Sequence, residues 1–480
     1  MFGYYADMKD ARFINAMAGL TGMRVRVGGI TADFTRYAMD VMDVAEVAPP
    51  PSLPLAPSRR LQFWPTSPRN FTASNLDTLL GFFSSAGLTA VFDLNELYGR
   101  NCSKHATMNC YVMDQWCVGS WDMSNVESFL HYLHDHALVA PNKTLTALEL
   151  GNELACHLDV PSTLSDIAAL ASLIQRVWAD TPSAQRPGLY APSTDVCSPS
   201  QLQVLGNLSA IPGVRGFSFH SYPGGDGVAP PLTEILLNET WLRGRLIPRG
   251  GAADCIEAWR AGPRAQGLEL WVTESSSSYS TTVPQPAQNS FLNGFFSLAE
   301  WGLYSSTGVT YLARWALSEP SPFATVARNA SRPGWDASHD YFLLRAWRAL
   351  VGGAALRVSG DVGSGALVFA YCAGGKSART GAVVVTAVNL GAEPLALALT
   401  QAAGSLPTEP RQEWIFTAPG GNLSSAMPIL NGGAALRLGE DGTPPDMPGK
   451  DVPAGGSGIT LPPLSQAFFL LPAAGAAACA

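Results

Sequence analysis

Short apolar runs alternate with longer amphipathic stretches over the first 350 residues of the chain. A run of apolar and β-branched residues predicts a buried strand, and apolar residues at every third or fourth position predict a helix. The predicted strands are Met23–Gly28, Thr89–Leu94, Thr146–Leu150, Gly188–Ala191, Gly216–His220, Glu269–Thr273 and Val309–Trp315. The predicted helices between them include Ser74–Ala86, Asn125–His136, Ser165–Ala179 and Gln288–Leu303.

Strands that alternate with helices are typical of βα units around a parallel sheet. Seven of the eight strands of a closed (β/α)8 TIM barrel are recognisable. We therefore predict an α/β fold with such a barrel over residues 1–350. In barrels of this kind, functional side chains gather at the C-terminal ends of the strands.

The pattern changes beyond about Val351. Helical periodicity stops, Gly and Pro become frequent, and runs such as Ala382–Leu390 and Ser465–Leu471 alternate in the manner of antiparallel strands. We therefore predict a C-terminal antiparallel β-sandwich domain over residues 351–480.

The charge balance excludes some partners. The net charge is -8 and the chain has only five lysines, which argues against nucleic acid or an anionic membrane surface. No apolar run approaches the roughly 20 residues of a spanning helix, so no integral membrane span is predicted. The apolar end, Ala467–Ala480, is interrupted by Pro472 and predicts a last strand and a tail, with a lipid-anchor signal as the alternative.

Glycosylation sequons favour the secretory pathway. Seven Asn residues stand two positions before Ser or Thr with no intervening Pro, which is more than chance would give. A secreted, extracellular, lysosomal or vacuolar protein is therefore expected. The seven are Asn70, Asn101, Asn142, Asn207, Asn238, Asn329 and Asn422.

The eight cysteines support the same compartment. Their number is even and none forms a CxxC pair, which favours disulfides over metal or redox chemistry. Cys102, Cys110 and Cys117 crowd one polar loop and are expected to pair among themselves or with Cys156. The partners of Cys197 and Cys255 stay open.

Two carboxylates end predicted strands. Leu148–Glu153 is an apolar run that enters Gly-Asn-Glu, and Leu270–Ser275 is a second run that ends in Glu274. Retaining glycoside hydrolysis requires two such groups, a proton donor and a nucleophile about 5 Å apart across the scissile bond. A buried strand end beside a second carboxylate also suits the proton donor, because desolvation and like charge both raise a carboxyl pKa.

Further candidates lie at the same strand ends: Asn95, Asn152, His220, Tyr222 and Arg314. Asn152 is placed to hold a sugar 2-hydroxyl, and Tyr222 to hydrogen-bond the nucleophile. His220 is interpreted as a wall residue of the site. Asn95 and Arg314 are equally compatible with a pocket wall and with a structural role.

Other polar residues carry no predicted function. Glu149 is interpreted as a buried structural partner. His131, His134 and His136 share one helical stretch without further ligands nearby, so neither a metal nor a cofactor is predicted.

Five ordered motifs carry a family resemblance. They occur in the order seen in heparanase-like proteins, the members of glycoside hydrolase family 79, and the likeness covers nearly the whole chain. It implies a (β/α)8 barrel with a β-sandwich and retaining endo- or exo-β-glucuronidase activity, with Glu153 as acid/base and Glu274 as nucleophile. The motifs are Val25–Gly29 with Asp33-Phe34, Glu149–Glu153, Phe219–Tyr222, Thr273–Ser276 and Leu461–Phe469.

The resemblance has further implications. It suggests a disulfide between Cys372 and Cys479. It also places the first barrel strand near Tyr4, so that Met1 falls inside the domain and the N-terminus is truncated. An oligo- or polysaccharide is the implied partner. Two alternative functions stay open. One is a non-catalytic homologue that binds glycans or matrix partners, and the other is a barrel glycosidase of the arabinofuranosidase or β-xylosidase kind.

Departures from the family pattern concern the substrate. Tyr279–Thr282 replaces a Gly-rich loop whose amides hold a uronate carboxylate, and Pro320–Phe323 replaces a Gly-Asn-Tyr segment. Ile30 stands at a position usually held by Thr or Ser. With few lysines and no basic cluster, we expect β-glucuronosyl or related linkages in weakly charged extracellular or cell-wall glycans, with heparan sulphate not the main substrate.

Overall fold

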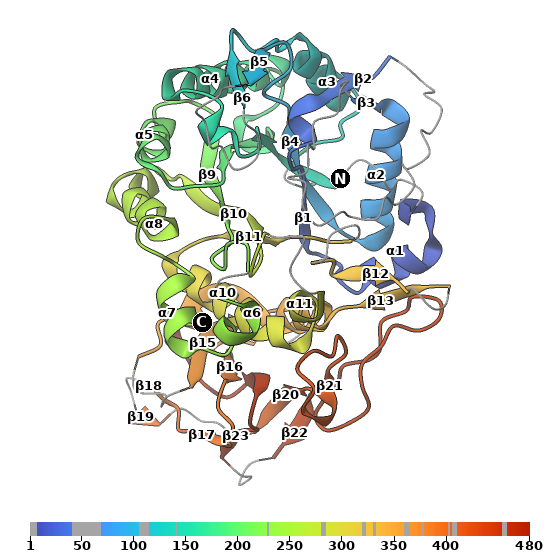
Figure 1. Cartoon of the computed structure of the whole chain (residues 1–480), viewed down its shortest axis with the longest axis vertical. Coiled ribbons are helices and arrows are strands. Elements are labelled where there is room, and N and C mark those ends of the chain that lie inside the picture. Colours follow the sequence, from blue (N-terminus) through green and yellow to red (C-terminus); the bar gives the residue numbers. More distant parts are fainter. Residues whose placement is uncertain are drawn as a thin grey trace.

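Two parts make up the fold, a barrel and an antiparallel sheet below it (Figure 1). The computed structural model describes residues 7–40, 69–104, 115–140, 142–227, 230–279, 285–318, 323–329, 333–359, 365–375, 379–401, 404–405, 410–453 and 458–480. The predicted first strand near Tyr4 and the residue Cys110 lie outside these ranges. None of the helices in the described ranges has the length and apolar character needed to cross a membrane.

Seven parallel strands form the nearly closed barrel, in the order β1-β4-β7-β8-β9-β10-β11. Each of them falls on a predicted strand, so the predicted α/β barrel class is confirmed. Because all are parallel, their C-terminal ends meet on one face. They are β1 (Arg24–Val27), β4 (Thr89–Leu94), β7 (Leu145–Leu150), β8 (Gly188–Thr194), β9 (Val214–Ser221), β10 (Glu269–Ser275) and β11 (Tyr311–Arg314).

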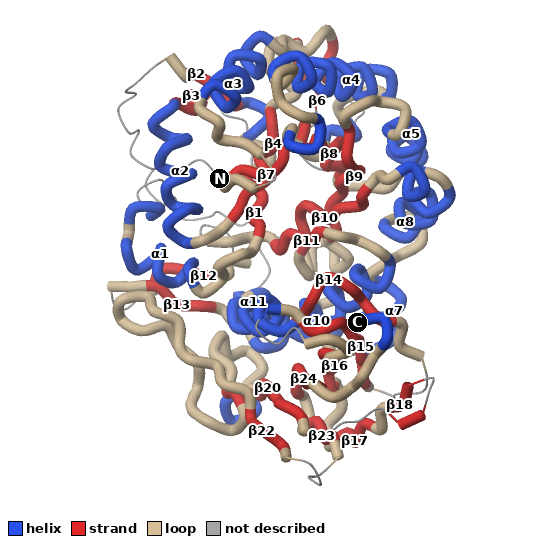
Figure 2. The backbone as a smooth tube through the Cα atoms, turned by 180° about the vertical axis from the view of Figure 1, so that it is seen from behind, coloured by secondary structure: helices blue, strands red, loops and turns tan. Residues whose placement is uncertain are grey.

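Helices surround the barrel strands (Figure 2). The side chain of Asp159 caps the N-terminus of α4, five residues before the predicted start. The two short helices α5 and α8 were not among the helices predicted from the sequence. The covering helices are α1 (Ala11–Ala18), α2 (Ala73–Ala86), α3 (Ser124–Asp135), α4 (Val160–Val177), α5 (Pro199–Leu208), α8 (Ala252–Ala261), α10 (Phe291–Thr307) and α11 (His339–Leu350).

Shorter elements decorate the loops. Two of them, β2 and β3, pair in parallel above the end of β4, while β5 and β6 form a hairpin. The short elements are β2 (Thr35–Ala38), β3 (Arg69–Thr72), β5 (Asn101–Lys104), β6 (Gln115–Val118), β12 (Val326–Arg328), β13 (Trp335–Ala337), α6 (Leu232–Ile235), α7 (Glu239–Arg245) and α9 (Gln285–Gln288).

Aromatic rings close the barrel at its N-terminal end. The rings of Tyr190 and Trp271 stack with centroids 3.2 Å apart, and the guanidinium of Arg24 lies over Trp271 and Tyr311. The hydroxyl of Tyr311 also donates to the carbonyl of Arg24 at 3.4 Å. These contacts join β11 to β1 and fill the N-terminal end of the barrel with aromatic rings.

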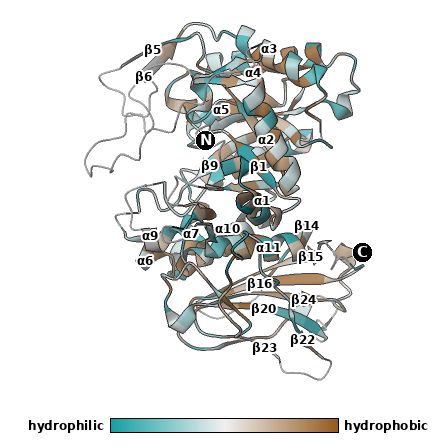
Figure 3. Cartoon of the chain, turned by 90° about the vertical axis from the view of Figure 1, so that its right-hand side faces the viewer, coloured by the Kyte–Doolittle hydropathy of each residue, from teal (hydrophilic) through white to brown (hydrophobic). Residues whose placement is uncertain are grey.

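An antiparallel sheet begins at Val351 with β14, and its central strands β16 and β24 are buried on both faces. Along β16, Val384 and Val388 belong to the core shared with the barrel helices, whereas Val383 and Val385 face the pair β17–β23. Figure 3 shows α10 and α11 lying directly on this sheet. The strands are β14 (Val351–Leu356), β15 (Ala366–Ala373), β16 (Val383–Asn389), β20 (Arg411–Thr417), β21 (Ile429–Leu430), β22 (Lys450–Val452) and β24 (Ser465–Leu471), flanked by the pairs β17 (Leu395–Leu397) with β23 (Ile459–Leu461) and β18 (Thr400–Gln401) with β19 (Gly404–Ser405).

Gln466 of β24 connects the two parts. Its amide nitrogen donates to the carbonyl of Phe291 at 3.1 Å, and its oxygen hydrogen-bonds the ring of His339. Gly294 makes room for this contact, because a Cβ there would lie 2.4 Å from His339. The C-terminal motif that contains Gln466 is therefore an interface with α10 and α11.

Three disulfides link described cysteines. Cys372 is bonded to Cys479, as the family resemblance implied. Cys102 is bonded to Cys117 within the crowded loop, and Cys197 to Cys255. The pairing of Cys156 stays a prediction.

Replacing both Cys372 and Cys479 by serine should lower the free energy of unfolding by about 4–5 kcal/mol in the chain-entropy model. The reason is that the bridge closes a long loop, with a sequence separation of 107. Urea unfolding of the oxidised protein measures the effect. The matched double replacement of Cys197 and Cys255, with a separation of 58, should lose about 0.5 kcal/mol less. An unchanged unfolding midpoint in the Cys372/Cys479 variant would refute the expectation.

Candidate active site

Glu153 lies in a tight turn that follows β7. Gly151 has φ +72° and Glu153 has φ +59°, so two residues of the turn adopt the left-handed conformation. Glycine suits position 151, because other residues rarely adopt φ +72° and a Cβ would lie 2.2 Å from a carboxylate oxygen of Glu96. In this turn the Glu153 carboxylate reaches His220 of β9.

Hydrogen bonds from backbone N–H groups fix the turn. The buried carboxylate of Asp33 accepts from the backbone N–H groups of Asn152, at 3.2 Å, and Glu96, at 3.3 Å. The N–H of Glu153 donates to the carbonyl of Ser193 at 2.9 Å. Asp33 thus holds the loops after β4 and β7 together, and Ser193 ties Glu153 to β8.

Glu274, near the end of β10, accepts two hydrogen bonds. The hydroxyl of Tyr222 donates to its Oε2 at 2.7 Å, as predicted, and Nη1 of Arg26 donates to its Oε1 at 2.6 Å. Burial alone would raise the pKa of Glu274, but the charges of His220 and Arg26 and the hydroxyl of Tyr222 hold it below its usual value. Glu274 is therefore a carboxylate in this site.

Arg26, from β1, lies at the centre of a buried charge network. Besides Glu274 it donates to Glu149, to Asp93 at 3.0 Å and to the hydroxyl of Ser193 at 2.7 Å. Its Nη2 also donates to the side-chain oxygen of Asn152 at 3.0 Å. One guanidinium thus orients the nearby carboxylates, and Glu149 has the predicted structural role.

His220 of β9 lies between the two candidate carboxylates. Its Nδ1 is 2.7 Å from Oε1 of Glu153 and 3.8 Å from Oε2 of Glu274, while Nε2 hydrogen-bonds Ser193 Oγ at 2.9 Å. Burial lowers the pKa of His220, but the two glutamates outweigh it and the net shift is upward. One ligand atom each of Glu153, His220 and Glu274 lie within 4.8 Å of one another.

That group of three also has the composition of a metal site. Its atoms are, however, already hydrogen-bonded, and the guanidinium of Arg26 lies 2.6 Å from Glu274, where it opposes a second cation. The contacts therefore fit an acid–base site better. His134 lies elsewhere, on the surface, with Asp135 and Asp180 as partners.

Aromatic side chains surround Tyr222. Its ring makes edge contacts with Trp315 at 6.0 Å and with Tyr279 at 6.3 Å between centroids. Both partners are half-buried, Tyr279 after β10 and Trp315 after β11. The residues that follow Tyr279, 280–282, and the segment 320–322 lie outside the described residues.

The structure does not bring every candidate into this cluster. The amide of Asn95 is fully buried, donates to the carbonyl of Thr35 and accepts from the indole of Trp121. Arg314 pairs with Asp340 at 2.5 Å and donates to the carbonyl of Phe323. Glu153, Glu274, Asn152, His220 and Tyr222 do come together.

Three residues of the site were not predicted from the sequence: Arg26, Asp33 and Ser193. The sequence did contain a pattern that could have indicated Arg26. Arg26, Asp93 and Glu149 each interrupt an apolar strand, and charged residues inside a barrel must pair with one another. Ser193 carried no such signal.

A family model and several known proteins are similar to this chain over most of its length. The model of the glycosyl hydrolase family 79 N-terminal domain matches residues 5–302. Heparanase-like protein 3 of Arabidopsis thaliana is 23% identical over 89% of this chain and 78% of its own length, and heparanase of Mus musculus is 23% identical over 85% and 71%.

Solved structures share the fold. A 4-O-α-L-rhamnosyl-β-D-glucuronidase from Fusarium oxysporum has a TM-score of 0.61 with 14% identity, over 98% of this chain and 94% of its own. A family 51 α-L-arabinofuranosidase from Bifidobacterium longum has a TM-score of 0.61 with 13% identity, over 96% and 89%. At such identities the likeness concerns the fold.

Proposed function

Because the chain belongs to glycosyl hydrolase family 79, we propose that it is a retaining β-glycoside hydrolase. Glu153 is its acid/base and Glu274 its nucleophile. The family and the heparanase-like relatives support hydrolysis of a glycosidic bond. The arrangement of the two carboxylates supports the retaining course.

The separation of Glu153 and Glu274 carries this proposal. Their nearest carboxylate oxygens lie within 4.8 Å. Inverting enzymes need about 6.5–9.5 Å to admit a water between the carboxylates, whereas retaining enzymes place them about 5–5.5 Å apart. The short separation leaves room for the sugar carbon and not for an additional water.

In the first step, Glu274 attacks the anomeric carbon and a covalent glycosyl ester forms. The bond to the leaving oxygen breaks at the same time, and Glu153 gives its proton to that oxygen. In the second step Glu153, now ionised, takes a proton from water. The oxygen of that water attacks the anomeric carbon, and Glu274 departs as a carboxylate.

The surrounding contacts suit both steps. Arg26 and Tyr222 hold the two oxygens of Glu274, which keeps the nucleophile ionised and oriented. Asn152, fixed by Asp33 and Arg26, is placed to hold the sugar 2-hydroxyl, a bond that strengthens in the transition state. His220, bound to Glu153, positions the acid.

For the substrate we propose β-glucuronosyl or related linkages in extracellular or cell-wall glycans. The names of the heparanase relatives support a uronic-acid-containing glycan. Disulfides and exposed sequon residues such as Asn70, Asn142 and Asn422 support a secreted protein. A non-catalytic, glycan-binding homologue is the competing function.

An activated 2-fluoro β-glucuronide should label Glu274 covalently. The fluorine slows both steps, and the good leaving group restores only the first, so the ester accumulates. Peptide mass spectrometry after incubation locates the adduct. An adduct on another residue would contradict the nucleophile assignment. Absence of any adduct and of any turnover on a panel of aryl β-glycosides would favour the non-catalytic homologue.

A further inference from the structure

Arg314, at the end of β11, belongs to a buried ion pair that the steps above do not use. Its Nε donates to Oδ2 of Asp340 at 2.5 Å, and only 6% of the Arg314 side chain and 1% of the Asp340 side chain are exposed. Asp340 lies on α11, the helix between the barrel and the antiparallel sheet. Because desolvation largely offsets the attraction within such a pair, stability alone does not explain it.

The ion pair holds the loop that follows β11. Nη1 of Arg314 donates to the carbonyl of Phe323 and, at 3.4 Å, to that of Trp315. The N–H of Trp315 in turn donates to the carbonyl of Ser275 at 2.8 Å. With its Nε fixed on Asp340, one guanidinium therefore sets the course of this loop beside the loop after β10.

The same oxygen of Asp340 also reaches the loops after β9 and β10. Oδ2 accepts a second hydrogen bond, from Nδ2 of Asn293 on α10, at 2.8 Å. The side-chain oxygen of Asn293 accepts from the hydroxyl of Ser277 at 2.7 Å, and the carbonyl of Ser277 accepts from the N–H of Gly224 at 3.0 Å. One carboxylate oxygen thus links three active-face loops to α11.

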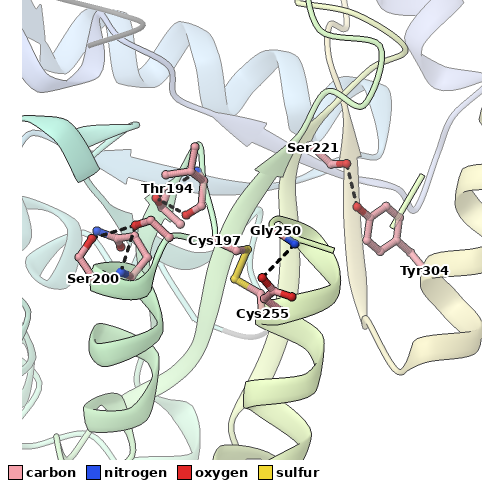
Figure 4. Close-up of a disulfide and its surroundings, with 11 residues drawn as sticks. Thr194, Cys197, Ser200, Ser221, Gly250, Cys255 and Tyr304 are labelled. Carbon is pink, nitrogen blue, oxygen red and sulfur yellow. Dashed lines mark hydrogen bonds between the residues drawn. A yellow bond between two sulfur atoms is a disulfide. The ribbon is translucent and has the colours of Figure 1, made fainter. Parts of the chain in front are cut away.

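The loop after β11 contacts the nucleophile through a tyrosine. The ring of Trp315 meets the ring of Tyr222 edge-on with centroids 6.0 Å apart, and the hydroxyl of Tyr222 donates to Glu274 at 2.7 Å. The residue before Tyr222 is held separately, because the hydroxyl of Tyr304 on α10 donates to Ser221 Oγ at 2.7 Å (Figure 4). The backbone of Tyr222 is therefore anchored on α10, and Trp315 is one of the two rings that pack against its side chain.

We propose that Asp340 is a positioning residue for the nucleophile. Through Arg314 it holds Trp315 against Tyr222. The hydroxyl of Tyr222 then stays on Glu274. The proposal rests on the proposed function and adds to it a residue of α11 that does not touch the reacting atoms. The contacts form a continuous chain of packed and hydrogen-bonded groups, which is the physical basis for such coupling.

The acidic limb of kcat/KM on an activated aryl β-glucuronide tests this, because it follows ionisation of the nucleophile in the free protein. Asp340→Ala should move the limb upward by about one pH unit, since a hydrogen bond to a charged carboxylate is lost. Tyr222→Phe should move it as far. The protein with both changes should show no further movement, because both remove the same hydrogen bond.

Direct charge effects of Asp340→Ala have the opposite sign. Burial raises the pKa of Glu300 to about 8 and lowers the pKa of His339 to about 4, and in both cases the charge of Asp340 contributes upward. Removing that charge lowers both pKa values, and it would likewise lower the pKa of Glu274. An upward movement of the limb therefore reports the lost hydrogen bond. Four titratable groups face Glu274 and are unaltered in this variant: Arg26, Glu153, His220 and Tyr222.

Further variants separate positioning from folding. Asp340→Ala leaves the charge of Arg314 buried without its counter-ion, which destabilises the fold. Arg314→Met combined with Asp340→Leu removes both charges and the donors to the loop, so it should show the same upward movement at a higher melting temperature. Asp340→Asn keeps the acceptor oxygen and should stay near the wild-type limb.

Glu413→Ala is the matched control, because the pair of Glu413 with Arg411 in β20 is similarly buried. It should lower the melting temperature and leave the acidic limb in place. Amide hydrogen exchange adds a readout that needs no turnover. In the Asp340→Ala protein the N–H groups of Trp315 and Gly224 should exchange faster, and in the Glu413→Ala protein they should not.

The outcomes are distinct. A limb that stays in place or moves downward in the Arg314→Met/Asp340→Leu protein overturns the proposal, and so does unchanged exchange at Trp315 in the Asp340→Ala protein. A wild-type protein that turns over no aryl glycoside, while exchange responds as expected, refutes the proposed function and supports the hold of Asp340 on the loop.

Discussion

Glu274→Gln should lower kcat/KM by on the order of 10⁴ or more on every glycoside, whatever its leaving group. The amide cannot form the glycosyl ester, so the first step is lost for good and poor leaving groups alike. Initial rates on an aryl β-glucuronide and on an oligosaccharide measure the loss. The melting temperature should change little, because glutamine keeps the shape that Arg26 and Tyr222 contact.

Glu269 offers a matched control on the same strand. It stands at the opposite end of β10, where it accepts from the Trp271 indole at 2.8 Å. Glu269→Gln should retain most of the activity. In a Glu274→Ala protein, azide should restore turnover of an activated glycoside and give the inverted glycosyl azide. A Glu274→Gln protein that retains a tenth of the wild-type rate would end this assignment.

Glu153→Ala should discriminate between leaving groups. Substrates that need protonation of the leaving oxygen should lose about 10²–10⁴ in kcat/KM, the range of general acid catalysis. For an activated aryl glycoside the first step needs no proton, so its loss should be much smaller and should appear mainly in the second step. A series of aryl glycosides of increasing leaving-group pKa measures the slope.

Glu127, on the outer surface of α3 with Arg176 as its partner, provides the control for this series. Glu127→Ala should show the slope of the unmodified protein. Equal losses on activated and poor leaving groups in Glu153→Ala would contradict the acid role. Azide should accelerate the second step in that variant and give a glycosyl azide of retained configuration.

The barrel was predictable because its strands are buried on both faces. Runs such as Thr89–Leu94 and Glu269–Thr273 contain consecutive apolar residues, and this separates them from the amphipathic helices. The start of α4 was placed too late because the Asp159 cap and the proline after it were not used as a start signal. The helices α5 and α8 are short and weakly periodic.

The site was predictable where motif and strand end coincide. Glu153 and Glu274 follow long apolar runs, and the parallel sheet brings both ends to one face. Asn95 and Arg314 also stand at strand ends, but the loop that follows a strand sets the direction of the side chain. For Arg314 that direction is toward Asp340, whose position depends on a distant helix.

The charge network could not be assembled from spacing alone. Arg26 meets Glu149 and Glu274 across 123 and 248 residues, respectively. Each contact depends on the order of the strands and on their register. A single sequence gives neither the strand order nor the register. A charged residue within each of three apolar strands nevertheless indicates that these charges pair with one another.

The left-handed backbone of Glu153 has a consequence for how the protein evolves. A non-glycine residue with φ +59° is less stable there than glycine by about 1 kcal/mol. Mutation to glycine at this position would therefore stabilise the fold while removing the proposed acid/base. In the proposed mechanism the glycine variant is inactive but more stable, so selection for turnover is what would keep a glutamate in the turn.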